Sequence, residues 1–183
     1  MTHKIQLFKP FVNRDEERMI TKVFKSDFWA SGSGIGYVKQ FENLMKKYVG
    51  TNNCVAVSSG TAALNLALSV FDLHNKEVIL PSLSFVSTAH AITLNGGIPI
   101  FADINPQTLC IDPNSIKKLV SKKTKMIIPV HFGGLPADLY EIKRICKENN
   151  LYLVEDAAHA SGSVYKKKKI GVYGDMVCFS FHP

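Results

Sequence analysis

LYLVEDAAHA, residues 151–160, reads as a short apolar strand that ends in two adjacent carboxylates. Ligands of open parallel sheets bind at the carboxyl ends of the strands, where Asp156 stands. A carboxylate buried there without a partner is costly. Asp156 therefore pairs either with a protonated ring nitrogen of a ligand or with local backbone N–H groups. His159, three residues on, either faces the same ligand or is structural.

Short apolar runs alternate with helical patterns on the N-terminal side of this strand. Strands without polar alternation are typical of a parallel sheet covered on both faces, and strand–helix alternation favours right-handed crossovers. The sequence predicts an α/β fold, a three-layer αβα arrangement with a mainly parallel central sheet, preceded by a helical segment over about residues 1–50. Strands are predicted at 54–58, 77–80, 98–102, 125–130, 151–155 and 176–181, and helices at 61–71, 84–95, 113–121 and 137–148.

The stretch SSGTAAL, residues 58–64, joins the first predicted strand to a helix. Gly60 lets a ligand approach the backbone closely. The N–H groups of Thr61 and Ala62, the Thr61 hydroxyl and the helix dipole favour a bound phosphate. Because Ser and Thr are also the usual N-cap residues, an ordinary helix cap is the alternative.

Three further strand ends carry candidate residues. Phe85 follows the strand at 77–80 and is either a stacking platform for a flat ring or part of the core. Ser180 ends the last strand and either offers its hydroxyl to a phosphate or is satisfied by backbone. His131 begins HFGG, residues 131–134, which predicts a glycine turn with a satisfied histidine, and lining of the pocket is the alternative.

Charge and composition exclude several classes of protein. The net charge of +7 is compatible with nucleic-acid binding. Two observations argue against this function: only three of the 22 cations are arginine, and no aromatic residues interleave the lysines. Lys166 to Lys169 are predicted to lie on a surface hairpin, as solvated lysines or as a polyanion patch. The motif at 32–36, GSGIG, does not fit GxGxxG and follows a helix rather than a strand. Both observations argue against a dinucleotide-binding site.

Cysteines and hydropathy bear on the compartment. The four cysteines are scattered without a CxxC pair, which argues against a disulfide framework and against a metal site and indicates reduced thiols in the cytosol. No apolar run reaches the roughly 18 residues of a membrane span. The N-terminus does not read as a signal peptide. The chain stops at Pro183 within apolar β-type sequence, and we expect a fragment.

Taken in order, the motifs SGTAAL, PSLSFVSTAHAI, FADI, PVHFGG, VEDAAHASGS and GDMVCFSFHP resemble the DegT–StrS family of pyridoxal-phosphate-dependent sugar aminotransferases. The resemblance runs from about residue 7 to the end and includes SDFWASGSGIGYVKQFENLMKKYVG. It implies aminotransferase fold type I, with residues 1–183 as an incomplete cofactor-binding large domain and with the C-terminal small domain absent.

The resemblance also implies roles for the residues at these strand ends. The cofactor is pyridoxal 5′-phosphate; the catalytic residues are Asp156, which pairs with its ring nitrogen, and His159, which stands where the family most often has glutamine. The family's Schiff-base lysine falls two residues after Pro183, at position 185, beyond the end of the chain. The cofactor-binding residues implied are Gly60, Thr61, Ala62, Phe85, Asp156, His159 and Ser180.

By the same resemblance, the full protein transfers an amino group from glutamate to a nucleotide-linked keto-sugar in the biosynthesis of amino sugars and polysaccharides. Its members are cytoplasmic homodimers that bind neither nucleic acid nor membrane, and residues 29–32 lie either near the partner's pocket or in a plain surface loop. The alternatives are a catalytically silent relative and a dehydratase relative, both of which bind the cofactor or a sugar nucleotide.

Overall fold

A central sheet of five parallel strands organises the computed structural model, which describes residues 10–27, 29 and 36–182. The strand order is β2–β1–β3–β4–β7, so the chain winds outward from β1 in both directions. The predicted parallel sheet is confirmed, with ends that differ by a few residues. Its strands are β1 (Glu77–Pro81), β2 (Ile98–Ala102), β3 (Thr124–Ile127), β4 (Tyr152–Ala157) and β7 (Met176–Phe179).

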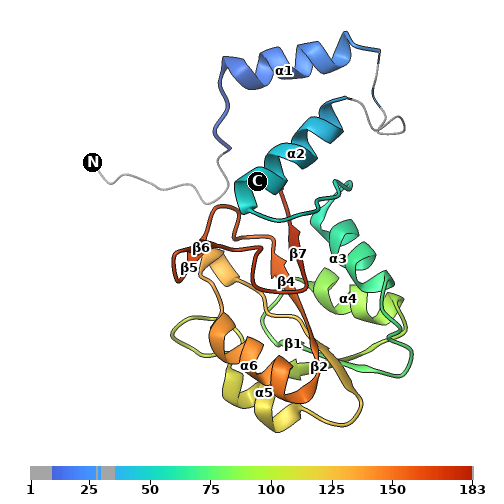
Figure 1. Ribbon diagram of the computed structural model, residues 1–183, viewed down its shortest axis with the longest axis vertical. Helices are drawn as coiled ribbons and strands as arrows, with labels where there is room; N and C mark the ends of the chain where they lie inside the picture. The colour runs from blue at the N-terminus through green and yellow to red at the C-terminus, as the bar shows by residue number, and fades with distance from the viewer. Residues whose placement is uncertain (1–9, 28, 30–35, 183) are drawn as a thin grey trace.

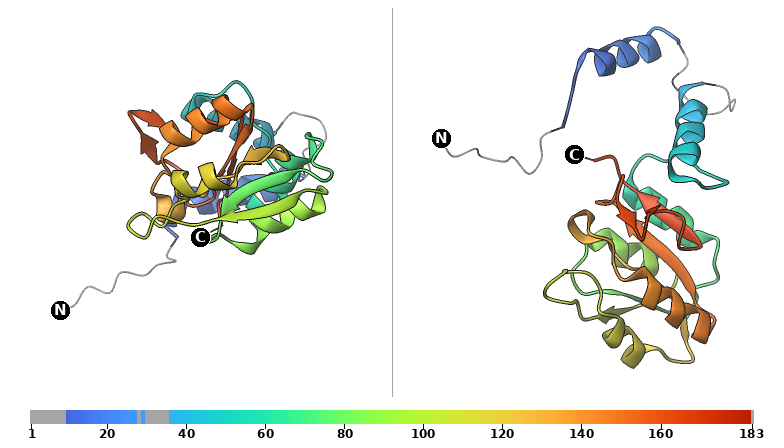
Figure 2. Two further views of the ribbon diagram at one scale, coloured as in Figure 1. Left: turned by 90° about the horizontal axis from the view of Figure 1, so that it is seen from below. Right: turned by 60° about the vertical axis from the view of Figure 1, so that its left-hand side comes forward.

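Helices cover both faces of the sheet and give the three predicted layers (Figure 1). One layer contains α3 (Gly60–Ser69) and α4 (Val86–Leu94), which pack on β7 and on β1 and β2. The opposite layer contains α5 (Pro113–Leu119) and α6 (Leu139–Asn149), which pack on β2 and on β3 and β4. The sheet edge-on between these layers is visible in Figure 2.

The core consists of two apolar clusters, one on each face of the sheet. Successive side chains of a strand point to opposite faces. On β1, Val78 and Leu80 join the cluster under α3 and α4, whereas Ile79 joins the cluster under α5 and α6. On β4, Val154 belongs to the first cluster and Leu153 to the second. This alternation sends the next two side chains of β4, Glu155 and Asp156, to opposite faces.

Two helices precede the sheet, as predicted. Asn13 caps α1 (Arg14–Phe24) with a reciprocal capping box that includes Glu16. The helix α2 (Tyr37–Val49) ends at Gly50, whose φ of 90° suits glycine. Figure 2 shows α1 apart from the sheet, and none of its residues is buried.

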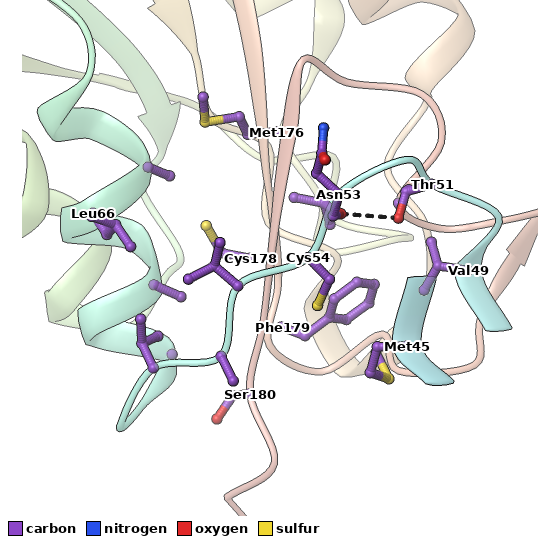
Figure 3. A pocket seen from close by; sticks show the side chains of 18 of the residues that line it. Met45, Val49, Thr51, Asn53, Cys54, Leu66, Met176, Cys178, Phe179 and Ser180 are labelled. Carbon is purple, nitrogen blue, oxygen red and sulfur yellow. Dashed lines mark hydrogen bonds between the residues drawn. The ribbon is translucent and has the colours of Figure 1, made fainter. Parts of the chain in front are cut away.

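The strand predicted at 54–58 is wrong. The segment is not paired with any strand in the described part of the chain, and Val55 and Val57 are 68% and 39% exposed. A strand forms only where a neighbour accepts its hydrogen bonds, but β7 pairs with β4 alone. Between this segment and β7 lies a cavity of about 1160 Å³. Figure 3 shows Cys54 on the segment, which leads to the start of α3.

The lysine run forms the predicted surface hairpin, β5 (Val164–Tyr165) and β6 (Lys168–Lys169). Two of its lysines lie against aromatic rings: Lys166 Nζ is 4.1 Å from the Tyr140 ring centroid, and Lys169 Nζ is 3.2 Å from that of Tyr48. The turn residues Lys166 and Lys167 have φ values of 44° and 69°. A two-residue hairpin turn with two positive φ values favours Asn-Gly, so lysine there is strained.

Replacing Lys167 with glycine is expected to stabilise the protein by about 0.5–1 kcal/mol, because the strain of a left-handed lysine is removed. The Lys166 contact with Tyr140 is untouched. The matched control is Lys168→Gly in β6, where the same change should destabilise. The free energy of unfolding in urea distinguishes the two, and equal effects would contradict the assignment of strain to the turn.

Two sequence predictions lie outside the described residues. The glycine-rich motif of residues 32–36 is described only at Gly36, and the loop of residues 29–32 only at Trp29. In the described ranges, no helix combines the length and the apolar character that crossing a membrane requires.

Candidate active site

The carboxylate of Asp156 is buried at the end of β4, on the face of the sheet that α4 covers. The residue is 4% exposed, and its Oδ2 accepts a hydrogen bond of 2.8 Å from the Thr88 hydroxyl. Its Oδ1 accepts a longer bond of 3.2 Å from the Ala158 N–H. The local backbone therefore supplies one of the expected donors. The remaining lone pairs of the carboxylate can accept from a ligand, and the pairing with a ring nitrogen stays a prediction.

Thr88 is a site residue that the sequence analysis missed. It is fully buried, and it lies in the first turn of α4, three residues after Phe85. Its N–H donates to the Phe85 carbonyl oxygen at 3.1 Å. Phe85, the extended N-cap residue, is exposed, whereas Thr88 is turned into the protein. Thr88 thus links the aromatic candidate to the carboxylate.

Phe85 is the N-cap of α4 and is 70% exposed. It is therefore not a core residue, the alternative that the sequence left open. A phenyl ring exposed to this extent is free to stack on a flat ligand.

The start of α3 and the end of β7 meet at Gly60 and Ser180. A Cβ built on Gly60 would lie 2.9 Å from the Ser180 Cβ, so a side chain at position 60 would displace β7. The structure corrects one expectation here: the Ala62 N–H is not free, because it donates to the Ser59 hydroxyl at 3.1 Å. Thr61 is exposed. The helix is capped, as the alternative held, and still presents Gly60, Thr61 and Ser180 together.

His159 is exposed after the end of β4. Its Nδ1 accepts a hydrogen bond of 3.2 Å from the Gly133 N–H, and its ring meets the Phe132 ring edge-on at 5.8 Å between centroids. A backbone N–H can only donate, so the proton of a neutral ring resides on Nε2. His159 therefore presents an N–H donor on its outer side.

The sheet register joins these groups. Asp156 stands directly beside Cys178 on β7, and Ser180 follows two residues later. Neighbouring strands lie about 4.8 Å apart and rise about 3.3 Å per residue. Two groups of residues thus lie at the carboxyl end of the sheet, at a spacing that one small ligand can span. The first is Asp156, Thr88 and Phe85, and the second is Gly60, Thr61 and Ser180. Within residues 10–27, 29 and 36–182, no group of three His, Cys, Asp or Glu side chains is placed to hold a metal ion.

Comparisons with known proteins identify the family of the chain. The chain is 39% identical over 98% of its length to the spore coat polysaccharide biosynthesis protein SpsC of Bacillus subtilis, and 33% identical over 97% to GDP-perosamine synthase of Vibrio cholerae. It covers 46% and 48% of these two relatives, so it spans about half of their length.

A solved Streptococcus pneumoniae protein in its PMP form superposes with a TM-score of 0.89 at 28% identity, over 98% of this chain and 48% of that one. A second form of it carries PLP. The predicted cofactor is thus confirmed as the cofactor of this structural relative, and the predicted fold class, the large domain of aminotransferase fold type I, is confirmed. Residues 10–183 match the DegT/DnrJ/EryC1/StrS aminotransferase family, to which the chain belongs.

Proposed function

We propose that the chain is the cofactor-binding large domain of a pyridoxal-phosphate-dependent aminotransferase that transfers an amino group from glutamate to a nucleotide-linked keto-sugar. The observation that carries the proposal is the buried Asp156 carboxylate, held by the Thr88 hydroxyl at the ligand edge of a parallel sheet. The family match and the amino-sugar relatives support the substrate class. We place the enzyme in the cytoplasm as a homodimer.

The residues at the sheet edge fit the chemistry of this cofactor. A pyridinium nitrogen needs an anionic partner, and Asp156 has acceptor capacity left after its two hydrogen bonds. A flat ring needs an apolar platform, and the exposed ring of Phe85 offers one at the start of α4. A phosphate needs hydroxyl and N–H donors without side-chain obstruction, and Thr61, Ser180 and the bare backbone at Gly60 supply these.

The cofactor, when bound, supplies an electron sink for the electrons left when a proton leaves the carbon beside its nitrogen. The Asp156 carboxylate would favour a protonated ring nitrogen, because a neighbouring opposite charge stabilises the charged form. Thr88 holds the carboxylate in its orientation, and Phe85 would stack on the ring. His159 would donate from Nε2 to the ring oxygen, the role that glutamine has in most of the family.

The proton shuttle would be a lysine at position 185, which lies after Pro183. A dehydratase relative would carry histidine at that position, and a silent relative another residue. The sequence downstream of Pro183 decides among these alternatives. We then expect the full-length protein to bind pyridoxal phosphate with a visible absorbance that borohydride abolishes, and to consume glutamate with a nucleotide keto-sugar. Absence of both would refute the proposal.

Replacing Thr61 with valine in the full-length protein is expected to weaken cofactor affinity by about 10- to 100-fold, because a hydrogen bond to a charged group is worth about 1.5–3 kcal/mol. The rate at saturating cofactor should change little. Titration with pyridoxal phosphate measures the affinity. The matched control is Thr93→Val, which removes an exposed hydroxyl that bonds only within α4. Equal affinities of both variants would contradict a phosphate site at Thr61.

A further inference from the structure

A second polar pair is buried on the opposite face of the sheet from Asp156. The side chains of His131 and Glu155 are both fully buried, and His131 Nε2 is 2.9 Å from Glu155 Oε2. Glu155 precedes Asp156 on β4, so it points away from the candidate active site. Nothing in the proposed chemistry uses this pair. Buried ionisable groups are expensive, which calls for an account of what the pair does.

The hydrogen bonds define where the proton of the pair lies. The Ala137 N–H donates to His131 Nδ1 at 3.1 Å, so Nδ1 is an acceptor and the ring proton is on Nε2. His131 Nε2–H then donates to Glu155 Oε2. The other carboxylate oxygen, Oε1, accepts from the Gly174 N–H at 2.6 Å. Every polar atom of the pair is thus matched to one partner of the opposite kind.

The pair connects three chain segments, two of which lead to the candidate-site residues Asp156 and Ser180. His131 follows β3, Glu155 is on β4, and Gly174 lies in the loop that leads into β7. The Asp156 N–H donates to the Pro129 carbonyl at 2.9 Å, and the His131 N–H donates to the Asp156 carbonyl at 3.1 Å. The main chain of Asp156 is therefore held by the same segment whose side chain is anchored to Glu155.

We propose that the His131–Glu155 pair is a positioning element that fixes the Asp156 carboxylate relative to the cofactor from the far face of the sheet. The inference rests on the proposed function, since it assigns a role toward the proposed ring partner. His131 anchors the segment that brackets the Asp156 peptide, and Glu155 ties that segment to the approach to β7. Loosening the pair lets Asp156 and Ser180 shift relative to each other, while the groups that contact substrate stay in place.

The donor and acceptor pattern predicts which variants preserve this function. Glutamine at position 131 offers a donor to Glu155 and an acceptor to the Ala137 N–H, so His131→Gln should keep both bonds. His131→Leu removes both and leaves the Glu155 charge buried without its donor. Glu155→Gln has nearly the same shape, but both of its partners, His131 Nε2–H and the Gly174 N–H, are donors. The NH2 group of the glutamine must therefore face one of these donors, and that hydrogen bond is lost.

The test compares these three variants in full-length holoenzyme, with kcat and KM for glutamate and with the pH dependence of the bound cofactor's absorbance. We expect kcat to fall by about 10- to 100-fold in His131→Leu and Glu155→Gln, since displacement of a reacting group by about 1 Å has effects of this size. KM should change less than about threefold, and His131→Gln should stay within about threefold of the parent. The absorbance titration should move only in the two disrupted variants.

Ile142→Ala is the control for lost stability, because Ile142 is fully buried in the core on the same face of the sheet and touches no site residue by hydrogen bond. Its folded fraction should keep the parental kcat and absorbance titration. If His131→Leu does not fold, the comparison of kcat and of the absorbance titration between Glu155→Gln and His131→Gln decides. Parental kcat and spectrum in folded Glu155→Gln would overturn the positioning role. Failure of the parent protein itself to bind cofactor would instead overturn the proposed function.

Discussion

Asp156→Asn in the full-length protein is expected to lower kcat by about 10- to 1000-fold. Removing a neighbouring opposite charge moves a pKa by about 1 to 3, and each step of 1.36 kcal/mol in the barrier is a factor of ten in rate. Asparagine keeps the shape of the side chain and can still accept from the Ala158 N–H, while the Thr88 hydroxyl can turn to meet the amide. The variant should therefore fold and bind cofactor.

The measurement is single-turnover kinetics at saturating cofactor. Asp72→Asn is the matched control, because it removes the same charge from an exposed side chain outside the candidate site. Turnover within about threefold of the parent in Asp156→Asn would remove the central support for the proposed function.

Gly174→Ala should destabilise the protein by about 3 kcal/mol. A Cβ at this position would lie 2.7 Å from the Leu153 carbonyl oxygen and 3.0 Å from Glu155 Oε1. The first neighbour is backbone inside β4, so the clash is relieved only by moving the loop away from the strand, with the cost of overpacking. That movement also lengthens the hydrogen bond that the Gly174 N–H donates to Glu155.

Urea unfolding measures this change, and a shift in midpoint without a change in slope identifies it as stability. Gly133→Ala is the control. Nothing lies within 4 Å of its added Cβ, but its φ of 59° adds strain, so the loss should be only about 1 kcal/mol. If the two variants lose the same free energy, the tight approach at Gly174 is not what makes glycine necessary there.

The hydrophobic pattern predicted the five strands of the central sheet, but it also predicted a strand at 54–58 that does not form. Short apolar strands such as β1 and β4 indicate a parallel sheet that is covered on both faces, because polar residues do not alternate regularly with the apolar ones. The segment at 54–58 has the same composition but is not a strand. Composition reports that a segment can be buried, whereas a strand also needs a neighbour to share its hydrogen bonds, and that neighbour is not encoded locally.

Candidate residues could be recognised where chemistry coincides with a strand end, as at Asp156 and Ser180. Thr88 was missed because a threonine inside a helix carries no distinct signal, and its partner is 68 residues away. The His131–Glu155 pair was only half visible: the histidine was predicted to be satisfied, but its partner could be assigned only once the alternation along β4 was known. Long-range pairing of polar groups is the information that a local pattern lacks.

The thiols offer an experimental handle that follows from their burial. Desolvation raises the pKa of Cys146 and of Cys178 to about 12, and burial also raises that of Cys110, so these three sulfurs stay protonated and unreactive. Burial raises the pKa of Cys54 as well, but this thiol is less enclosed and lines the cavity beside β7. A maleimide dye would therefore reach Cys54 in preference to the three buried thiols, and its fluorescence would report whenever another stretch of polypeptide enters that space.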